Sequence, residues 1–394
     1  MSEMLERAVR KKYKLKKQAY FIIGVFVLVV ILFIGVIASG IVNTIRLEHR
    51  GYKADTVHYF KEHKLTKLVV NNEEYAEALD KAIFEDEFED KYAKDYFDIS
   101  YSHAIKDFEK NVNLLLKKGY SGKTASHIVN NLSKEDTDYI LEAKYDDGIA
   151  DIFNTGFSAN DKFLRYINFR AAHPELSTKN IVTYVNIGLD QANYTDAATI
   201  EAPADLLVLV NKHNKIPDNY EPDDLVILPV DISAGEQMLR KDAAKHFEKM
   251  AKAILEEKEL IIKADSSYRD RNRQGTIYNQ YVTSHGQEAA DIYAVMAGFS
   301  EHQTGLGVDI ANKFNDDITP EMPQYDWLRK NAYKYGFVYR YPDDKQDITG
   351  FNPEPWHYRY VGEKTAKKVH DSKLTLDEYI AQLPTKSEDP KPAD

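Results

Sequence analysis

The pattern of hydrophobic positions begins with one long uninterrupted run. Between Lys17 and Arg46 the chain holds no charged residue, and the centre of this segment reads AYFIIGVFVLVVILFIGVIASGIV. At about 1.5 Å rise per residue, about 24 apolar residues span the roughly 30 Å of a bilayer's hydrocarbon core. A cleaved signal peptide is the alternative, but its apolar region is normally about 7 to 15 residues long. We therefore interpret residues 19–45 as a transmembrane anchor.

Basic residues flank this apolar segment unequally. The flank before the apolar segment has only two acidic residues, Glu3 and Glu6, and seven basic ones: Arg7, Arg10, Lys11, Lys12, Lys14, Lys16 and Lys17. The basic residues close to the segment on the other side are Arg46 and Arg50. Under the positive-inside rule the more basic flank stays in the cytoplasm. The sequence thus predicts a single-pass protein with a basic cytoplasmic tail over residues 1–18 and everything after Ile45 outside the membrane.

Helical periodicity dominates residues 46–200. Apolar residues in AIKDFEKNVNLLLKKG recur at helical spacing, and Gly119 is a typical helix stop. Ser133, three residues before Asp136, predicts a helix start through a capping-box variant with Asp in place of Glu or Gln, and ELSTKNIVTYVNIGLD has a similar Ser or Thr start. Together with GYSGKTASHIVNNL, these segments share a pattern that indicates either a degenerate internal repeat or simple similarity of short amphipathic helices. We predict a mostly helical extracytoplasmic region.

Near residue 200 the hydrophobic pattern changes to short apolar runs separated by Asn, Asp and Pro, which is typical of strands and turns. A helix is predicted where six apolar residues form one stripe: Leu239, Ala243, Phe247, Met250, Ala251 and Ile254. Strands are expected in LIIKADSSYR, FVYRYP and PWHYRYVG, and helices in QEAADIYAVMAG, YDWLRKNAYKYG and LTLDEYIAQL. Helices mixed with short strands predict an α+β domain over residues 201–385, followed by a disordered polar tail over residues 386–394.

Composition narrows the function. The net charge is -11 although the N-terminal tail is basic, so the exported part is acidic and is not expected to bind nucleic acid. The apolar fraction of 43% is enough to build a core. The chain has no cysteine, so it can form neither disulfides nor thiolate metal sites. Any metal must be held by His, Asp or Glu.

Four residues suggest such a metal site. A catalytic zinc site uses three protein ligands and leaves one position open for water. His302 and Asp309 supply two candidate ligands, but a histidine and an acid seven positions apart are a weak signal by themselves. NPEPWHYRYVG adds Glu354 three residues before His357, on what we expect to be a rigid strand bounded by Pro355. Together they offer two imidazoles, one carboxylate ligand and one spare carboxylate.

These residues resemble the VanY-type D-alanyl-D-alanine carboxypeptidases, a family of zinc peptidases. The family pattern is Ser-x-His-x-x-Gly-x-x-x-Asp followed by Glu-x-x-His, and this chain reads Ser300, His302, Gly305 and Asp309, then Glu354 and His357. SSYRDRNRQ resembles the family's Ser-Gly-Tyr-Arg segment with a downstream Gln. Ser267 stands where Gly is usual, and Gly307 where Ala is usual; both exchanges are between small residues. The resemblance covers roughly residues 200–385.

The resemblance implies a set of roles and a fold. It implies a zinc-peptidase domain with a small antiparallel sheet and flanking helices, in which zinc is bound by His302, Asp309 and His357. Glu354 is implied as the catalytic carboxylate. Arg269 is implied to face the substrate, either clamping a terminal carboxylate or stabilising an oxyanion. Gln274 and Ser300 are implied as substrate-binding residues.

The expected function is that of a membrane-anchored zinc D,D-carboxypeptidase that removes the C-terminal D-alanine from peptidoglycan stem peptides. An L,D-carboxypeptidase acting on the tetrapeptide stem is the alternative within the enzyme class, since the resemblance includes both activities. A protein that binds or organises the cell wall with an inactive zinc fold is the alternative outside it. Residues 46–200 could bind glycan, act as a spacer or contact a partner, and their composition does not choose among these.

Overall fold

The computed structural model describes residues 2–384, and the predicted disordered tail at 386–394 lies outside the described residues. The chain forms two compact units, one extending through Ala150 and the other beginning at Asp151. The boundary that the sequence predicts near residue 200 therefore falls inside the second unit, and it stays a prediction. Both units are built as expected, the first mostly from helices and the second from helices around a small sheet.

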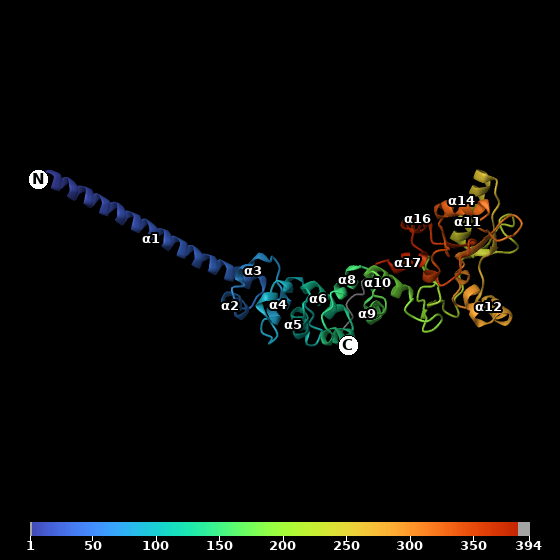
Figure 1. The fold of residues 1–394 in the computed structure, drawn as a ribbon, viewed down its shortest axis with the longest axis horizontal. Helices are drawn as coiled ribbons and strands as arrows, with labels where there is room; N and C mark the ends of the chain where they lie inside the picture. The colour runs from blue at the N-terminus through green and yellow to red at the C-terminus, as the bar shows by residue number, and fades with distance from the viewer. Residues whose placement is uncertain (1, 385–394) are drawn as a thin grey trace. The chain divides into compact units, whose positions relative to one another are not determined.

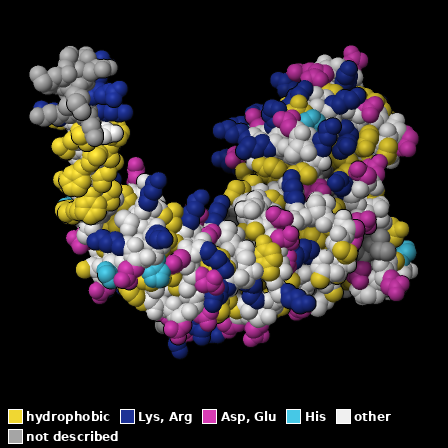
Figure 2. Space-filling view, turned by 60° about the vertical axis from the view of Figure 1, so that its left-hand side comes forward, with side chains coloured by type: hydrophobic (Ala, Val, Ile, Leu, Met, Phe, Trp, Pro, Cys, Tyr) yellow, Lys and Arg dark blue, Asp and Glu magenta, His cyan; other side chains and the backbone are white. Residues whose placement is uncertain are grey.

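The first unit starts with one long helix, α1 (Ser2–Arg50), which is the blue helix at the N-terminus in Figure 1. Within it, Tyr13–Arg50 is long and apolar enough to cross a membrane, by length and composition. Large apolar side chains from Tyr20 to Ile45 are exposed along this helix. Figure 2 shows them as a yellow surface, with dark blue Lys and Arg side chains toward the N-terminal end. Such a helix is compatible with the predicted anchor.

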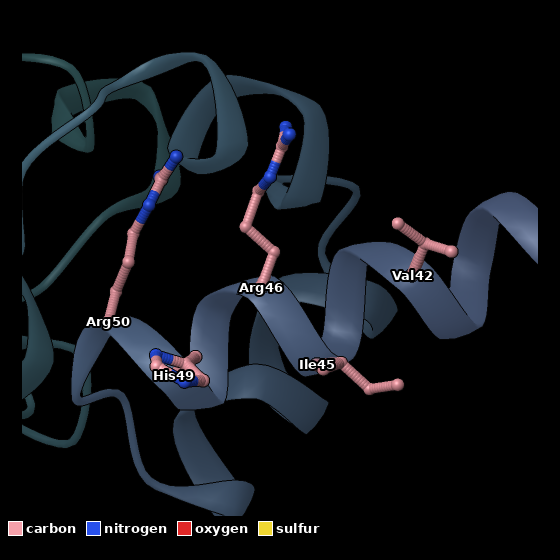
Figure 3. A pocket seen from close by; sticks show the side chains of 5 residues that line it. All are labelled: Val42, Ile45, Arg46, His49 and Arg50. Carbon is pink, nitrogen blue, oxygen red and sulfur yellow. The ribbon is translucent and has the colours of Figure 1, made fainter.

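The C-terminal end of α1 is fixed to the helices that follow it. Leu47 is fully buried, and the Arg50 guanidinium donates to the carbonyl oxygens of Val69 at 3.1 Å and Val70 at 3.0 Å, and to that of Asn72. These carbonyls belong to the last turn and the C-cap of α3 (Thr66–Asn71). A cation is electrostatically favourable at the C-terminal end of a helix. Figure 3 shows Arg50 and Arg46 on one side of the helix, beside Val42, Ile45 and His49, around a surface pocket.

Short helices complete the first unit: α2 (Ala54–Glu62), α4 (Glu77–Ala82), α5 (Phe108–Lys118), α6 (Gly122–Asn131) and α7 (Lys134–Glu142), with 3-10 turns η1 (Asp90–Tyr92) and η2 (Asp95–Asp98). The predicted ends are confirmed in two of them. Gly119 ends α5 with φ of 114°, which a residue without Cβ adopts readily. Ser133 caps α7 by accepting a 3.0 Å hydrogen bond from the backbone N–H of Asp136.

The second unit opens with α8 (Gly148–Asn154), whose first residues belong to the first unit, and with η3 (Asn160–Lys162), α9 (Phe163–Ala172) and α10 (Thr178–Ile187). The sequence predicts a Ser or Thr start for α10, and Ser177 is the residue that caps it. The helix then contacts the far end of the chain, because Asn186 donates to the carbonyl of Ala381 at 3.0 Å and Gln382 donates to the Thr183 hydroxyl at 3.2 Å. Ala381 is the last residue of α17 (Leu376–Ala381).

The central sheet is antiparallel and has the strand order β5-β6-β8-β7. Its strands are β5 (Lys263–Ser266), β6 (Gly307–Ala311), β8 (His357–Tyr360) and β7 (Phe337–Tyr339). Two small pairs lie before it in sequence: β1 (Ala198–Thr199) with β2 (Asn214–Lys215), and β3 (Leu225–Ile227) with β4 (Met238–Arg240). The remaining elements are α11 (Lys241–Lys258), α12 (Arg271–His285), α13 (Gln287–Tyr293), η4 (Glu301–Thr304), α14 (Pro323–Asn331), η5 (Ala332–Tyr335), α15 (Gln346–Thr349) and α16 (Glu363–Ser372).

One face of this sheet carries the hydrophobic core. Val308, Ile310, Tyr358 and Tyr360 are buried in a single cluster with the apolar stripe of α11 and with Trp327 and Leu328 of α14. The predicted stripe is confirmed except for Leu239, which is buried in the same cluster but belongs to β4, because α11 begins only at Lys241. Side chains alternate along a strand, so Asp309 and His357 point away from this core. They form the beginning of the site.

Candidate active site

The two sheet residues of the site are neighbours by register. Asp309 in β6 is paired with His357 in β8 and, on its other side, with Ser266 in β5. Directly opposed residues in an antiparallel pair bring their side chains to the same face. The Asp309 Oδ1 lies 2.8 Å from the His357 Nδ1. The spacing of 48 positions in sequence thus becomes a direct contact.

His302 comes from the 3-10 turn η4, just before β6. Its Nδ1 donates a hydrogen bond of 2.8 Å to the carbonyl oxygen of Ser267, which leaves Nε2 facing Asp309 Oδ2 at 3.3 Å. Gly305 ends the turn with φ of 67°, and a Cβ at this position would lie 2.9 Å from a Leu225 methyl carbon. Glycine is therefore needed where the chain turns from His302 into the strand that carries Asp309.

Ser267, which replaces the more usual glycine, is accommodated by its own hydrogen bonds. Its hydroxyl donates to the Gln237 side-chain oxygen at 2.8 Å and accepts from the backbone N–H of Met238 at 3.0 Å. The residue is buried, with an exposed fraction of 1%. The exchange thus leaves the carbonyl that orients His302 in place.

The three predicted ligands form a compact group that fits a metal ion. One ligand atom from each of His302, Asp309 and His357 lies within 4.8 Å of the others. Two imidazole nitrogens and one carboxylate oxygen are the donors that catalytic zinc sites use when thiolates are absent. Both histidine side chains are almost completely buried, and that of Asp309 is 14% exposed. The donor set therefore fits zinc.

Electrostatics within this group favour a charged Asp309. Burial alone would raise its pKa, but His302 and His357 hold the pKa of the Asp309 carboxyl well below its usual range. For His357, burial opposes protonation, yet the carboxylates of Asp309 and Glu301 raise its pKa to about 9. Because a metal ligand must be deprotonated, binding of a metal displaces a proton from this group.

Glu354 lies beside the ligand group without belonging to it. It occupies the loop before β8, so the predicted strand position is wrong: β8 begins only at His357. The loop is nevertheless fixed, because the Glu354 N–H donates to the carbonyl of Tyr341 at 3.1 Å and its carbonyl accepts from the His357 N–H at 3.0 Å. The Glu354 Oε2 lies 3.7 Å from the His357 Nδ1. Burial raises the pKa of Glu354 to about 7.

Arg269 is a further charged group next to Asp309, besides the two histidines. Its Nη2 lies 3.5 Å from the Asp309 Oδ2 and donates to the Ser266 hydroxyl at 2.9 Å, and its Nη1 donates to the Gln274 side-chain oxygen at 2.9 Å. Gln274 donates in turn to the carbonyl of Val295 at 2.6 Å and is 2% exposed. Gln274 is thus a buried hydrogen-bond partner that fixes the position of the Arg269 guanidinium.

Ser300 is buried directly before η4, and its hydroxyl does not cap that turn. The structure therefore brings together the three ligand candidates, Glu354 and Arg269, with Gln274 behind them and Ser300 at the start of the turn that carries His302. Whether each residue performs its predicted role stays a prediction.

A buried charge network adjoins the site, and the sequence analysis missed it. Glu301, next to His302, receives hydrogen bonds of 2.8 Å from Arg340 and from Arg359, and all three side chains are at most 1% exposed. Arginines inside the short apolar strands FVYRYP and PWHYRYVG were the available signal, because a buried guanidinium requires a buried carboxylate.

Comparison with known proteins identifies the family. A family model described as D-alanyl-D-alanine carboxypeptidase, VanY, matches residues 236–363. The putative carboxypeptidase YodJ of Bacillus subtilis is 42% identical over 193 residues, which cover 47% of this chain and 70% of that protein. The chain belongs to the VanY-type D-alanyl-D-alanine carboxypeptidase family. The bifunctional D-Ala-D-Ala dipeptidase and carboxypeptidase VanXYC of Enterococcus gallinarum is 34% identical, over 44% of this chain and 92% of that protein.

Solved structures of VanY-type proteins are also similar to this chain. The LdcB LD-carboxypeptidase is 41% identical, with 48% of this chain and 92% of that chain covered and a TM-score of 0.45. A mutant of a VanY D,D-pentapeptidase in complex with Zn(II) is 32% identical, with 44% of this chain and 98% of that chain covered and a TM-score of 0.38. The family model and the two relatives confirm the resemblance inferred from the motifs. The protein is a carboxypeptidase of the VanY type that acts on peptidoglycan peptides, and its His302, Asp309 and His357 side chains form a group that fits zinc.

Proposed function

We propose that this protein is a membrane-anchored zinc D,D-carboxypeptidase, which hydrolyses the terminal amide of the pentapeptide stem and releases D-alanine. One observation carries the proposal: a carboxylate that is not needed as a ligand, Glu354, lies 3.7 Å from His357, beside three side chains that fit zinc. A base next to a metal site is the arrangement that hydrolysis of an amide requires. The matched family model is described as D-alanyl-D-alanine carboxypeptidase, which supports the choice of bond.

His302, Asp309 and His357 would hold the zinc ion. When bound, zinc supplies a Lewis acid that polarises the amide carbonyl and lowers the pKa of a water molecule to about 7. Glu354 accepts the proton of the attacking water and returns it to the amine of the departing D-alanine. Its pKa of about 7, raised by burial, suits a group that both takes and gives a proton near neutral pH.

Arg269 is the group in this site that can bind an anion. It is fixed by Ser266 and Gln274 and is 14% exposed. A fixed guanidinium can clamp the terminal carboxylate of the substrate bidentately, or stabilise the oxyanion that forms as water attacks. A carboxylate clamp is already strong in the substrate complex, whereas an oxyanion contact becomes strong only in the transition state. Kinetic measurements can therefore separate the two roles.

We expect Arg269→Lys to lower kcat/KM for D-alanine release by roughly 10- to 100-fold, because a lysine cannot reproduce a planar, bidentate contact. Steady-state kinetics on synthetic pentapeptide would show an increase in KM alone if Arg269 clamps the carboxylate, and a decrease in kcat if it stabilises the oxyanion. Arg329→Lys, at an exposed position of α14, is the control. Unchanged kcat/KM in Arg269→Lys would exclude both roles.

The N-terminal helix completes the proposal. With the N-terminus in the cytoplasm, as the basic flank predicts, the catalytic unit would lie outside the membrane, where peptidoglycan precursors and nascent wall are found. The exposed apolar surface of α1 supports insertion of this helix. Fusing a reporter that is active only in the cytoplasm to the C-terminus tests the orientation, and reporter activity would contradict it.

Assays on two different stem peptides distinguish a D,D-carboxypeptidase from an L,D-carboxypeptidase. Purified full-length protein in detergent should release D-alanine from the pentapeptide stem and should leave the tetrapeptide, whose last bond joins an L-centre to D-alanine, essentially intact. Both peptides should be assayed at equal concentration with quantification of free D-alanine. Release from the tetrapeptide alone would replace the proposal by an L,D-carboxypeptidase, which is the activity of the LdcB protein.

A further inference from the structure

Glu301 is a buried carboxylate that the proposed reaction does not use. Its Oε1 accepts hydrogen bonds of 2.8 Å from the Nε of Arg340 and from the Nη1 of Arg359. Its Oε2 points elsewhere, toward the Nε2 of His357 at 3.4 Å. The carboxylate therefore lies between two arginines and a predicted metal ligand.

The network around Glu301 is balanced without a charge on His357. Arg340 also binds Asp377, through a contact to Oδ2 and a second of 3.2 Å to Oδ1, and Asp377 is fully buried. Arg359 uses its Nη2 to donate to the carbonyls of Leu206 at 3.0 Å and Val208 at 2.9 Å. Two guanidinium groups thus face two carboxylates. Glu301 can remain an anion in the interior, and its second oxygen is available to accept from a neutral imidazole.

The two imidazoles of the site are oriented through opposite nitrogens. His302 donates from Nδ1 to the Ser267 carbonyl, so its Nε2 faces Asp309. In His357 the Nδ1 faces Asp309 and the Nε2 faces Glu301. A neutral imidazole carries one proton, and the hydrogen bond made by one nitrogen determines which nitrogen is free for a metal. Glu301 would hold that proton on the Nε2 of His357.

We propose that Glu301, fixed by Arg340 and Arg359, is a positioning residue that sets the ring orientation and tautomer of His357, so that Nδ1 is presented to the metal. The inference rests on the metal site of the proposed function, but it is independent of whether the enzyme cuts a D,D or an L,D bond. Partners that orient a ligand in this way contribute about 10- to 100-fold to metal affinity.

The test compares two isosteric changes in the same network. In Glu301→Gln the single amide oxygen remains with Arg340 and Arg359, and the NH2 group, a donor, replaces the oxygen that faces His357. Asp377→Asn removes an equally buried charge that pairs with Arg340 and makes no hydrogen bond to His357 among the described contacts. Zinc affinity should be measured for the full-length protein by competition with a chromophoric chelator. We expect Glu301→Gln to bind zinc about 10- to 100-fold more weakly than wild type, and Asp377→Asn to stay within about 3-fold.

Equal weakening in both variants, or none in Glu301→Gln, would overturn the inference while leaving the proposed function in place. A wild-type protein that binds no zinc would overturn both. Should Glu301→Gln fail to fold, the ring nitrogens of the zinc-loaded wild type decide: ¹⁵N spectra of histidine-labelled protein should show the proton of His357 on Nε2 and that of His302 on Nδ1. A proton on the Nδ1 of His357 would overturn the inference.

Discussion

Replacing Glu354 by Gln is expected to lower kcat for D-alanine release by about 10²- to 10⁴-fold, which is the usual contribution of a general base. The amide has nearly the same shape as the carboxylate but cannot accept the proton of the attacking water. Because Glu354 lies 3.7 Å from His357 and does not belong to the ligand group, zinc content should stay at one ion per chain. Single-turnover kinetics and metal analysis of the same preparation measure both quantities.

The metal analysis separates catalysis from structure. Glu248→Gln, at an exposed position of α11, controls for the general effect of removing a glutamate. A Glu354→Gln enzyme that keeps its zinc and retains kcat within about threefold of wild type would show that another group supplies the base. Loss of zinc together with activity would instead assign Glu354 to the metal site.

Asp309→Asn is expected to abolish stable zinc binding, with a loss of affinity beyond the roughly 100-fold of a partner outside the ligand set. Asp309 contacts both histidines, at 3.3 Å and 2.8 Å, and also faces Arg269 at 3.5 Å. A neutral amide can neither serve as an anionic ligand nor balance these groups. Chelator competition measures the affinity, and D-alanine release should fall in parallel and recover only partly at high zinc concentration.

A neighbouring carboxylate provides the control for this change. Asp317 follows β6 and is close enough for the negative charge of Asp309 to contribute to its raised pKa, although burial is the larger cause. It is not one of the residues that could hold the metal. Asp317→Asn should therefore keep its zinc. An Asp309→Asn protein with wild-type zinc affinity would contradict the ligand assignment.

The ligand candidates could be predicted from the sequence because the donors lie in two short motifs. The absence of cysteine excluded thiolate ligands, and the resemblance of these motifs to the VanY-type family implied His302, Asp309 and His357, which the structure brings within 4.8 Å. What the sequence could not supply was the pairing of β6 with β8, which places Asp309 opposite His357. Strand register depends on contacts far apart in the chain, so local patterns do not determine it.

Glu301 shows where local patterns stop being informative. In the sequence it is one acid among 63 acidic residues, placed next to a histidine. Its proposed role depends on Arg340, which directly follows β7, and on Arg359 of β8, and both side chains are fully buried. Only their meeting in space distinguishes it from a solvated surface charge. The wrong strand position of Glu354 has a similar origin, because its loop is fixed by a backbone hydrogen bond to Tyr341.

The start of a helix was predicted correctly where a side chain caps it, and was placed too early for α11, where no side chain does. The caps at Ser133 and Ser177 depend on contacts within three residues, and both were confirmed. Leu239 was assigned to the helix because it continues the apolar stripe of α11. It lies instead on β4, where cross-strand pairing with Val226 overrides helical periodicity. The apolar spacing predicts the burial of Leu239 correctly, as it does for the stripe of α11, but the pairing of β4 with β3 decides the backbone conformation of Leu239.

The most direct test of the central claim is D-alanine release from the pentapeptide stem by the full-length protein, measured after removal of metal with a chelator and again after addition of one equivalent of zinc. We expect no release from the metal-free protein, full recovery with zinc, and no recovery for Glu354→Gln in the same assay. Release that persists without metal, or that zinc restores equally in Glu354→Gln, would contradict the assignment of this site as a zinc carboxypeptidase centre.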